Sequence, residues 1–147
     1  MRYAGYVRVS QESDLDSIEQ QKEEINNYLI NTGKSSIGTI DWYIDIGCSA
    51  KAIEGPEIKK LVAQIELGEV VEIVVTNFNR IVRYNYSEES FLIVIDFLKL
   101  LGEHKVLLTC ISDKNENNTF ELENVGSSLE DYFGYMVKGG NNNNKDN

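Results

Sequence analysis

The sequence predicts an α/β domain with a central, mostly parallel sheet of four or five strands and helices on both faces. Short apolar segments rich in β-branched residues alternate along the chain with longer segments whose apolar residues repeat at helical spacing. This alternation favours a parallel sheet, because each helix returns the chain to the edge where the next strand begins. The 147 residues, 41% of them apolar, are enough to bury one core.

The predicted elements follow one another regularly. Each strand is a short apolar run, and each helix is an amphipathic segment bounded by capping or turn residues. In chain order they are a strand at 3–9, a helix at 17–33, a strand at 40–46, a helix at 56–67, a strand at 70–76, a helix at 88–101, a strand at 105–111 and a short helix at 126–138.

Helix boundaries are predicted from residues that satisfy the free backbone groups at helix ends. Ser17 and Gln20 match a capping box, so the first helix is expected to begin at Ser17. Pro56 suits the first turn of the second helix. Ser127 opens another capping box, whereas residues 139–147 carry nothing apolar to bury and are expected to form a disordered tail.

Charge and composition exclude several classes of protein. Twenty-four acidic residues against fourteen basic ones give a net charge of −10, so nucleic-acid contact would require a local cluster of positive charge. The chain lacks an apolar run of bilayer length and a signal-peptide pattern, which favours a cytoplasmic protein without membrane contact. Two cysteines, Cys48 and Cys110, are too few for a disulfide framework or a metal site.

Three of the four arginines fall where a parallel sheet places its ligands, beyond the carboxyl ends of the strands. Arg8 and Ser10 close the first strand, and Arg80 and Arg83 follow the third. Guanidinium groups match phosphate oxygens in pairs, and a hydroxyl among them suits nucleophilic attack on a phosphodiester. From the residues alone, the alternative stays open that these side chains only end a strand and pair with surface carboxylates.

Four motifs resemble, in order and spacing, those of the serine recombinase family of resolvases, invertases and large serine integrases. The resemblance covers about residues 1–112. The motifs are Tyr6-x-Arg8-Val9-Ser10, Ser17-x-x-x-Gln21, Asp45-x-Gly47-x-Ser49-Ala50 and Asn79-Arg80-x-x-Arg83.

The resemblance implies a site-specific DNA recombinase. Ser10 would attack a DNA phosphodiester, forming a 5′-phosphoserine link and releasing a 3′-hydroxyl, and Arg8, Arg80 and Arg83 would hold the scissile phosphate. No metal or cofactor is implied, because the phosphoserine bond conserves the energy of the broken link. The lone histidine, His104, lies away from both strand ends and is given no role.

The resemblance also implies supporting residues, partners and boundaries. Tyr6, Gln21, Asp45 and Asn79 would line the site and bind substrate. The catalytic domain would span residues 1–138 with an abbreviated C-terminal helix. It would act as a dimer or tetramer on DNA held by a missing or separate DNA-binding domain, so the chain is expected to be part of a longer recombinase or a small relative that needs a partner.

Two departures from the family pattern support a second hypothesis. Asn79 stands where the family has an aspartate, and Gly55 fills the position of a further active-site arginine, with Lys51 as a nearby cation. A recombinase-like domain with impaired chemistry could serve as a regulatory or dimerising partner of an active enzyme. A third reading, a receiver-type signalling domain, expects an acidic cation-binding cluster that Asp45 alone does not supply.

Overall fold

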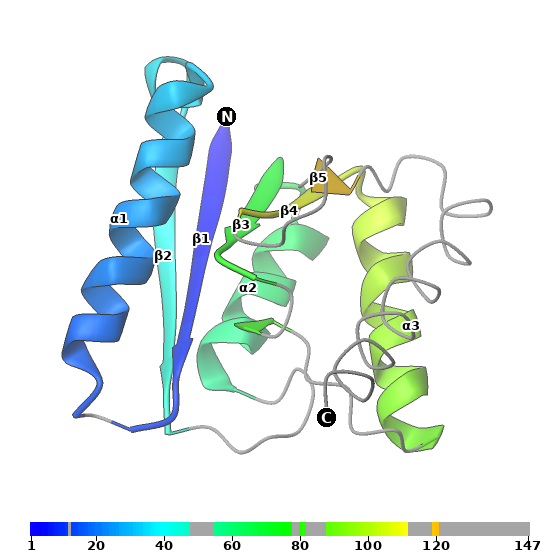
Figure 1. Ribbon diagram of the computed structural model, residues 1–147. Helices are drawn as coiled ribbons and strands as arrows, with labels where there is room; N and C mark the ends of the chain where they lie inside the picture. The colour runs from blue at the N-terminus through cyan, green and yellow to red at the C-terminus, as the bar shows by residue number, and fades with distance from the viewer. Residues whose placement is uncertain (12, 48–54, 78–79, 82–87, 112–118, 121–147) are drawn as a thin grey trace, which may run out of the picture.

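The computed structural model describes residues 1–11, 13–47, 55–77, 80–81, 88–111 and 119–120 (Figure 1). Five strands form one sheet in the order β2-β1-β3-β4-β5, in which the first four are parallel and β5 is antiparallel to β4. The strands are β1 (Arg2–Val9), β2 (Thr39–Ile46), β3 (Glu72–Val75), β4 (Leu107–Cys110) and β5 (Thr119–Phe120). The helices are α1 (Leu15–Asn31), the 3-10 turn η1 (Lys34–Ser36), α2 (Pro56–Glu66) and α3 (Glu88–Glu103). The predicted α/β class and mostly parallel sheet are therefore confirmed.

Helices cover both faces of the sheet, as predicted. α1 packs on one face, where Val7 and Val74 meet the apolar stripe of the helix that includes Ile25. α2 and α3 pack on the opposite face, over Tyr6 and Ile73 and their neighbours. Successive residues of β1 alternate between these two cores, as the two-residue period of a strand requires. Both faces of β1 are therefore buried, which explains its almost continuous apolar sequence.

Two predicted helix patterns differ from the structure. α1 begins at Leu15 rather than at Ser17, because the carbonyl of Asp14 accepts the first helical hydrogen bond, from the amide of Ile18. The predicted capping box is thus wrong, and Ser17 lies inside the first turn. For the third helix the sequence predicts an apolar stripe of Phe91, Leu92, Ile95, Leu98 and Leu101. In α3 the buried stripe instead includes Val94, and Leu92 is 54% exposed.

The far end of the chain departs from the prediction in one element. The polar residues 113–119 predict a segment without regular structure after the fourth strand, yet Thr119 begins β5 and pairs with Thr109 of β4. The predicted helix at 126–138 and the tail at 139–147 lie outside the described residues.

A buried carboxylate lies near the amino edge of the sheet. Glu72, 2% exposed, begins β3 and forms an ion pair with Lys34 at 2.6 Å. It also accepts hydrogen bonds from the hydroxyls of Tyr28 at 2.8 Å and Thr109 at 2.9 Å. These contacts join α1, η1, β3 and β4. Burial alone would lower the pKa of Lys34, but its hydrogen bonds to Glu72 and Tyr28 outweigh burial and raise that pKa.

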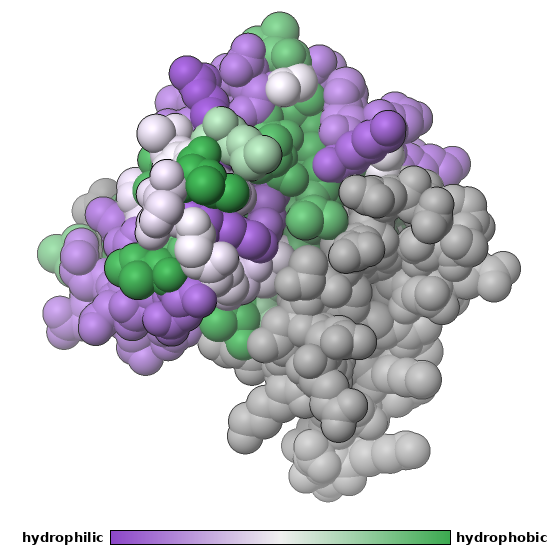
Figure 2. All heavy atoms as spheres, turned by 90° about the horizontal axis from the view of Figure 1, so that it is seen from above, coloured by the Kyte–Doolittle hydropathy of each residue, from purple (hydrophilic) through white to green (hydrophobic). Residues whose placement is uncertain are grey.

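The surface at the amino ends of the strands is mixed in character. Figure 2 looks down on the edge where β1 begins and shows apolar side chains interspersed among polar ones. Met1, Ile30, Ile37 and Leu67 are each more than half exposed. In the part of the chain that the structure describes, no helix is both long and apolar enough to cross a bilayer.

Candidate active site

The order of the strands places the candidate site at the carboxyl ends of β1 and β3. The chain passes from β1 to β2 on one side and then returns across β1 to β3 on the other. Ligands of open α/β sheets bind where the order reverses in this way. Arg8 is the penultimate residue of β1, with its side chain on the same face as Tyr6, and Ser10 directly follows the strand and is exposed.

The backbone carbonyl of Arg8 joins three elements. It accepts a hydrogen bond from Nη1 of Arg80 at 3.2 Å and another from Nε2 of Gln21 at 3.2 Å. Arg80 follows β3, and Gln21 belongs to α1. The structure thus brings together the arginines that the sequence places 72 positions apart, two residues from Ser10.

Gln21 occupies a position that the helical pattern reserves for apolar residues. It is buried, 4% exposed, on the stripe that also contains Ile18, Ile25 and Leu29. Its Nε2 also donates to Oγ of Ser17 at 3.2 Å. The side chain therefore links α1 to β1 and supports the strand that carries Ser10.

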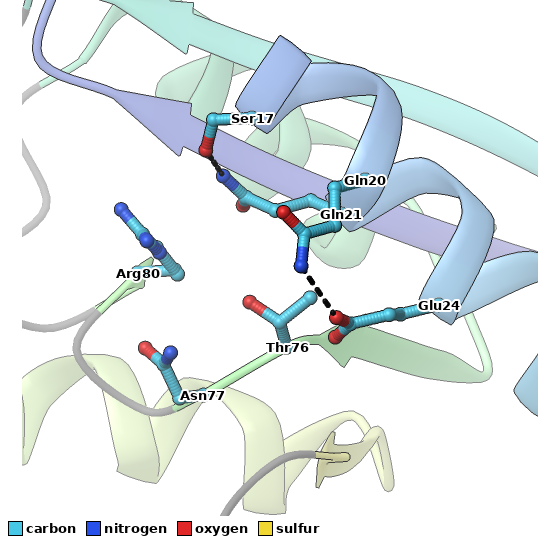
Figure 3. A pocket seen from close by; sticks show the side chains of 7 residues that line it. All are labelled: Ser17, Gln20, Gln21, Glu24, Thr76, Asn77 and Arg80. Carbon is cyan, nitrogen blue, oxygen red and sulfur yellow. Dashed lines mark hydrogen bonds between the residues drawn. The ribbon is translucent and has the colours of Figure 1, made fainter. Parts of the chain in front are cut away.

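A small polar cavity of about 180 Å³ lies beside this carbonyl, between α1 and the end of β3 (Figure 3). Its lining residues come from α1 and from the segment that follows β3, and Figure 3 shows the two groups of side chains on opposite sides of the space. They are Ser17, Gln20, Gln21, Glu24, Thr76, Asn77 and Arg80. Three buried polar atoms here have no hydrogen-bond partner within the described part of the chain: Oε1 of Gln21, Oδ1 of Asn77 and Nε of Arg80.

Asp45 forms a second buried polar centre, at the end of β2. Its carboxylate is 1% exposed and accepts three hydrogen bonds, from the Tyr6 hydroxyl at 2.8 Å and the backbone amides of Glu57 at 2.9 Å and Ile58 at 3.1 Å. The two amides belong to the first turn of α2. A carboxylate at this place satisfies free N–H groups and complements the positive end of the helix dipole. Asp45 of β2 therefore caps the amino end of α2, and the Tyr6 hydroxyl links this carboxylate to β1.

Comparison with protein families decides the identity of the fold. The family described as "Resolvase, N terminal domain" matches residues 3–134 of the 147. This chain belongs to the resolvase family. A search of curated proteins finds no match.

Solved structures support the resolvase fold at low sequence identity. The N-terminal catalytic domain of TP901-1 integrase is 20% identical, with a TM-score of 0.64, over 99% of this chain and 98% of that one. A resolvase family site-specific recombinase from Streptococcus pneumoniae is 21% identical, with a TM-score of 0.58, over 100% and 99%. A serine recombinase from Sulfolobus solfataricus is 23% identical, with a TM-score of 0.55, over 92% and 85%.

In this resolvase-family domain, Gly55 lies directly against the Asp45 cap. A Cβ atom built at Gly55 would stand 2.1 Å from Oδ2 and 2.3 Å from Cγ of Asp45. Real side chains do not tolerate such a contact, so the carboxylate and a side chain at position 55 compete for one space. The absence of a side chain at Gly55, where the family resemblance places an arginine, therefore leaves the space that the Asp45 carboxylate occupies.

Several predicted site residues fall outside the described part of this resolvase-family chain. These residues are Arg83, the third predicted arginine, Asn79, which stands in place of the family's aspartate, and Lys51, the cation near Gly55. Within the described residues, no group of three His, Cys, Asp or Glu side chains could hold a metal ion. Both carboxylate oxygens of Asp45 accept hydrogen bonds, from Tyr6 and from the first turn of α2. They are therefore not available as cation ligands, which disfavours the receiver-type hypothesis.

Sequence reasoning missed the polar cavity of this resolvase-family domain. Ser17, Gln21 and Glu24 follow the three- and four-residue spacing of one helix face, which could have indicated a polar stripe on α1. Thr76 and Asn77 directly follow a buried strand at the edge where ligands bind. What the sequence could not provide is that the two groups face each other.

Proposed function

We propose that this resolvase-family catalytic domain cleaves and rejoins DNA through a covalent link to Ser10. The observation that carries the proposal is the hydrogen bond from Arg80 to the carbonyl of Arg8, which holds the two arginines at the ends of adjacent strands beside an exposed serine. Guanidinium groups in this position can neutralise charge that develops on the oxygens of an attacked phosphate.

In the proposed reaction, Oγ of Ser10 forms a bond to the phosphorus, and the proton of its hydroxyl is transferred, in net, to the leaving 3′-oxygen. The bond from phosphorus to the 3′-oxygen breaks, and that oxygen leaves as a hydroxyl after gaining a proton. Arg8 and Arg80 would bind the non-bridging oxygens, with Arg83 as the third cation in the proposal. Attack by a 3′-hydroxyl on the phosphoserine reverses these steps and reseals the strand, so no external energy source is needed.

Other residues position β1 through hydrogen bonds without touching the phosphate. Gln21 would fix the Arg8 carbonyl, and the Tyr6–Asp45 pair would tie β1 to the first turn of α2. In the proposal these are positioning roles. We propose further that the domain works as a dimer or tetramer, because strand exchange needs more than one cleaved strand, and that Asn79 contacts the substrate.

Trapping of the covalent intermediate tests the proposed function. The purified protein is incubated with a nicked DNA crossover site, and the adduct is identified by mass spectrometry of peptides. We expect a DNA adduct on Ser10 that is absent in Ser10→Ala and retained in Ser13→Ala, a matched exposed serine in the same segment. An adduct that survives Ser10→Ala would refute the mechanism.

A second candidate function is favoured by the contact between Gly55 and Asp45. This contact leaves no room for the arginine that the family resemblance places at position 55, and the net charge of −10 disfavours DNA binding by the domain alone. The domain could then regulate or dimerise with an active recombinase. Absence of an adduct, together with co-purification of an active resolvase-family partner, would support this candidate over the first.

A further inference from the structure

We propose that the open edge of β2 binds a second copy of this chain, strand against strand and antiparallel. β2 is the outermost strand of the sheet, and within the described residues β1 is the only strand that pairs with it. A second copy bound there would continue the sheet across a two-fold axis. The pairing does not rest on the proposed function, because it uses neither Ser10 nor the arginines.

Hydrogen bonds at the two ends of β2 fix which residues face the open edge. The amide of Thr39 donates to the carbonyl of Met1 at 3.0 Å, and the amide of Gly47 donates to the carbonyl of Val9 at 3.1 Å. Main-chain groups alternate in direction along a strand, so the odd-numbered residues between these two also face β1. The N–H and C=O groups of residues 40, 42 and 44 therefore point toward the open edge.

Two of these residues lean over β1 and so leave the edge itself uncovered. Trp42 pairs with Gly5 of β1, and a Cβ atom built at Gly5 would lie 2.5 Å from Cζ3 of Trp42 and 3.1 Å from Cδ1 of Ile40. Nζ of Lys22 lies 5.3 Å from the centroid of the Trp42 ring and helps to hold it there. The main-chain groups of the edge are therefore within reach of another strand.

Residues 40–44 carry none of the features that protect natural edge strands from pairing. Such strands are commonly guarded by lysine, proline or a bulge. This stretch reads Ile-Asp-Trp-Tyr-Ile, and its register with β1 runs without a break from Thr39 to Ile46. Asp41 is its one charged residue. An edge of this kind favours the addition of a further strand.

The sequence of this edge is self-complementary about Trp42. In an antiparallel pair centred there, the two Trp42 residues lie opposite each other, and Ile40 of each copy lies opposite Ile44 of the other. The outward N–H and C=O groups of each such pair exchange two hydrogen bonds. These side chains share the face of the sheet that α1 covers, so the cross-strand pairs on that face are apolar. On the other face, Asp41 lies opposite Tyr43, and no like charges meet.

The neighbouring registers are disfavoured by charge. A pair centred on Asp41 would place the two Asp41 carboxylates opposite each other. A pair centred on Tyr43 would place Asp41 opposite Asp45 of the second copy. Like charges directly opposite each other destabilise a pair of strands, so the register centred on Trp42 is favoured.

The effect of salt distinguishes a second copy from a basic segment of another protein. Each copy carries a net charge of −10, which opposes self-association at long range. Salt screens this repulsion beyond roughly 8 Å at physiological ionic strength, whereas the contacts at the edge act at short range. Association of two copies should therefore strengthen as salt is added. Binding of a basic segment beside Asp41 would weaken instead.

Hydrogen exchange of the full chain, observed by NMR at several protein concentrations, tests the proposal. We expect the amides of Ile40, Trp42 and Ile44 to be protected at high concentration and to exchange at least about tenfold faster on dilution. The amides of Asp41 and Tyr43, which face β1, are the internal control and should stay protected. Fast exchange of the edge amides at every concentration would overturn the proposal. Protection that dilution does not change would place the cover of the edge within the chain itself and would also overturn it.

A matched pair of variants tests the main-chain contact by analytical ultracentrifugation. Ile44→Pro removes an amide that faces the open edge and leaves the hydrogen bonds to β1 available. Ile44→Ala shortens the same side chain but keeps that amide. We expect Ile44→Pro to weaken self-association about tenfold or more relative to Ile44→Ala, with exchange at Asp41 and Tyr43 showing that the strand is folded in each. Equal self-association of the two folded variants would contradict the proposed pairing.

Two further measurements identify the occupant. Ser10→Ala protein should associate as the unmodified protein does, so a failed adduct experiment leaves this result interpretable. Self-association that strengthens with salt supports a second copy. Absence of self-association, together with salt-sensitive binding of an added peptide of alternating lysine and valine, would assign the edge to a basic partner segment and overturn the proposal.

Discussion

Replacement of Gly55 by alanine should destabilise the domain through Asp45. The new Cβ would lie 2.1 Å from Oδ2, so the carboxylate must leave its position. It would then lose the hydrogen bonds from the amides of Glu57 and Ile58 and from Tyr6. Loss of a helix cap costs about 0.5–2 kcal/mol, and a buried polar group left without its partner costs about 1–3 kcal/mol.

We therefore expect Gly55→Ala to lower the free energy of unfolding by about 3 kcal/mol, which lowers the Tm of a chain of this size by about 10 °C. Urea denaturation followed by circular dichroism measures the first quantity, and calorimetry measures the second. Glycine at this position has φ −67° and ψ 153°, a conformation open to alanine, so backbone strain does not contribute.

A double-mutant cycle isolates the cause. In an Asp45→Ala background the obstructing carboxylate is absent, and Gly55→Ala should cost less than about 1 kcal/mol. If the two effects simply add, or if Gly55→Ala alone stays within about 0.5 kcal/mol of the unmodified protein, the argument from the Asp45 contact is wrong. The same reasoning predicts that Gly55→Arg destabilises the domain rather than restoring an active-site cation.

Further predictions concern the other buried polar contacts. Tyr6→Phe removes one of the hydrogen bonds to Asp45 and should cost about 1–2 kcal/mol in urea denaturation. Lys34→Met leaves the Glu72 carboxylate buried without its cation and should cost about 3–5 kcal/mol near neutral pH. The raised pKa of Lys34 means that its contribution is complete below the unfolded-state pKa and is lost as pH rises through the folded-state pKa, so the stability difference between the two proteins should shrink in strongly alkaline buffer. Gln21→Met removes a donor from the Arg8 carbonyl and should slow adduct formation about tenfold, whereas Gln20→Met should not.

Periodicity predicted the fold well because burial enforces it. The apolar residues at 58, 61, 62 and 65 predict a buried stripe for the second helix. In α2, Ile58, Leu61 and Ile65 are buried, and β1 is buried on both faces. Patterns failed where two local signals competed. Ser17 and Gln20 have the spacing of a capping box, but Asp14, three residues upstream of Ser17, is the N-cap residue, and the helix begins at Leu15. Local sequence does not reveal which of two candidate caps is used.

The proximity of Arg8 and Arg80 could be predicted, since a parallel sheet brings the carboxyl ends of adjacent strands to the same edge. The role of Asp45 was not predictable from its place at the end of a strand, because it depends on the amides of Glu57 and Ile58, which lie 12 and 13 residues further along the chain. The sequence predicts Glu72 within an apolar strand, and the cation that allows burial of its carboxylate comes from Lys34, 38 residues away. Polar contacts between distant segments leave no periodic signature.

The contacts at residue 8 make it possible to measure the role of the Arg8 side chain without disturbing the position of β1. Gln21 and Arg80 both bind the main-chain carbonyl of Arg8, not its guanidinium. Every amino acid supplies that carbonyl, so substitution of the Arg8 side chain leaves both acceptor bonds available and the end of β1 anchored. Arg8→Ala and Arg8→Lys are therefore suitable for measuring what the guanidinium alone contributes, and a library at position 8 could change what the domain binds without loosening the strand that presents Ser10.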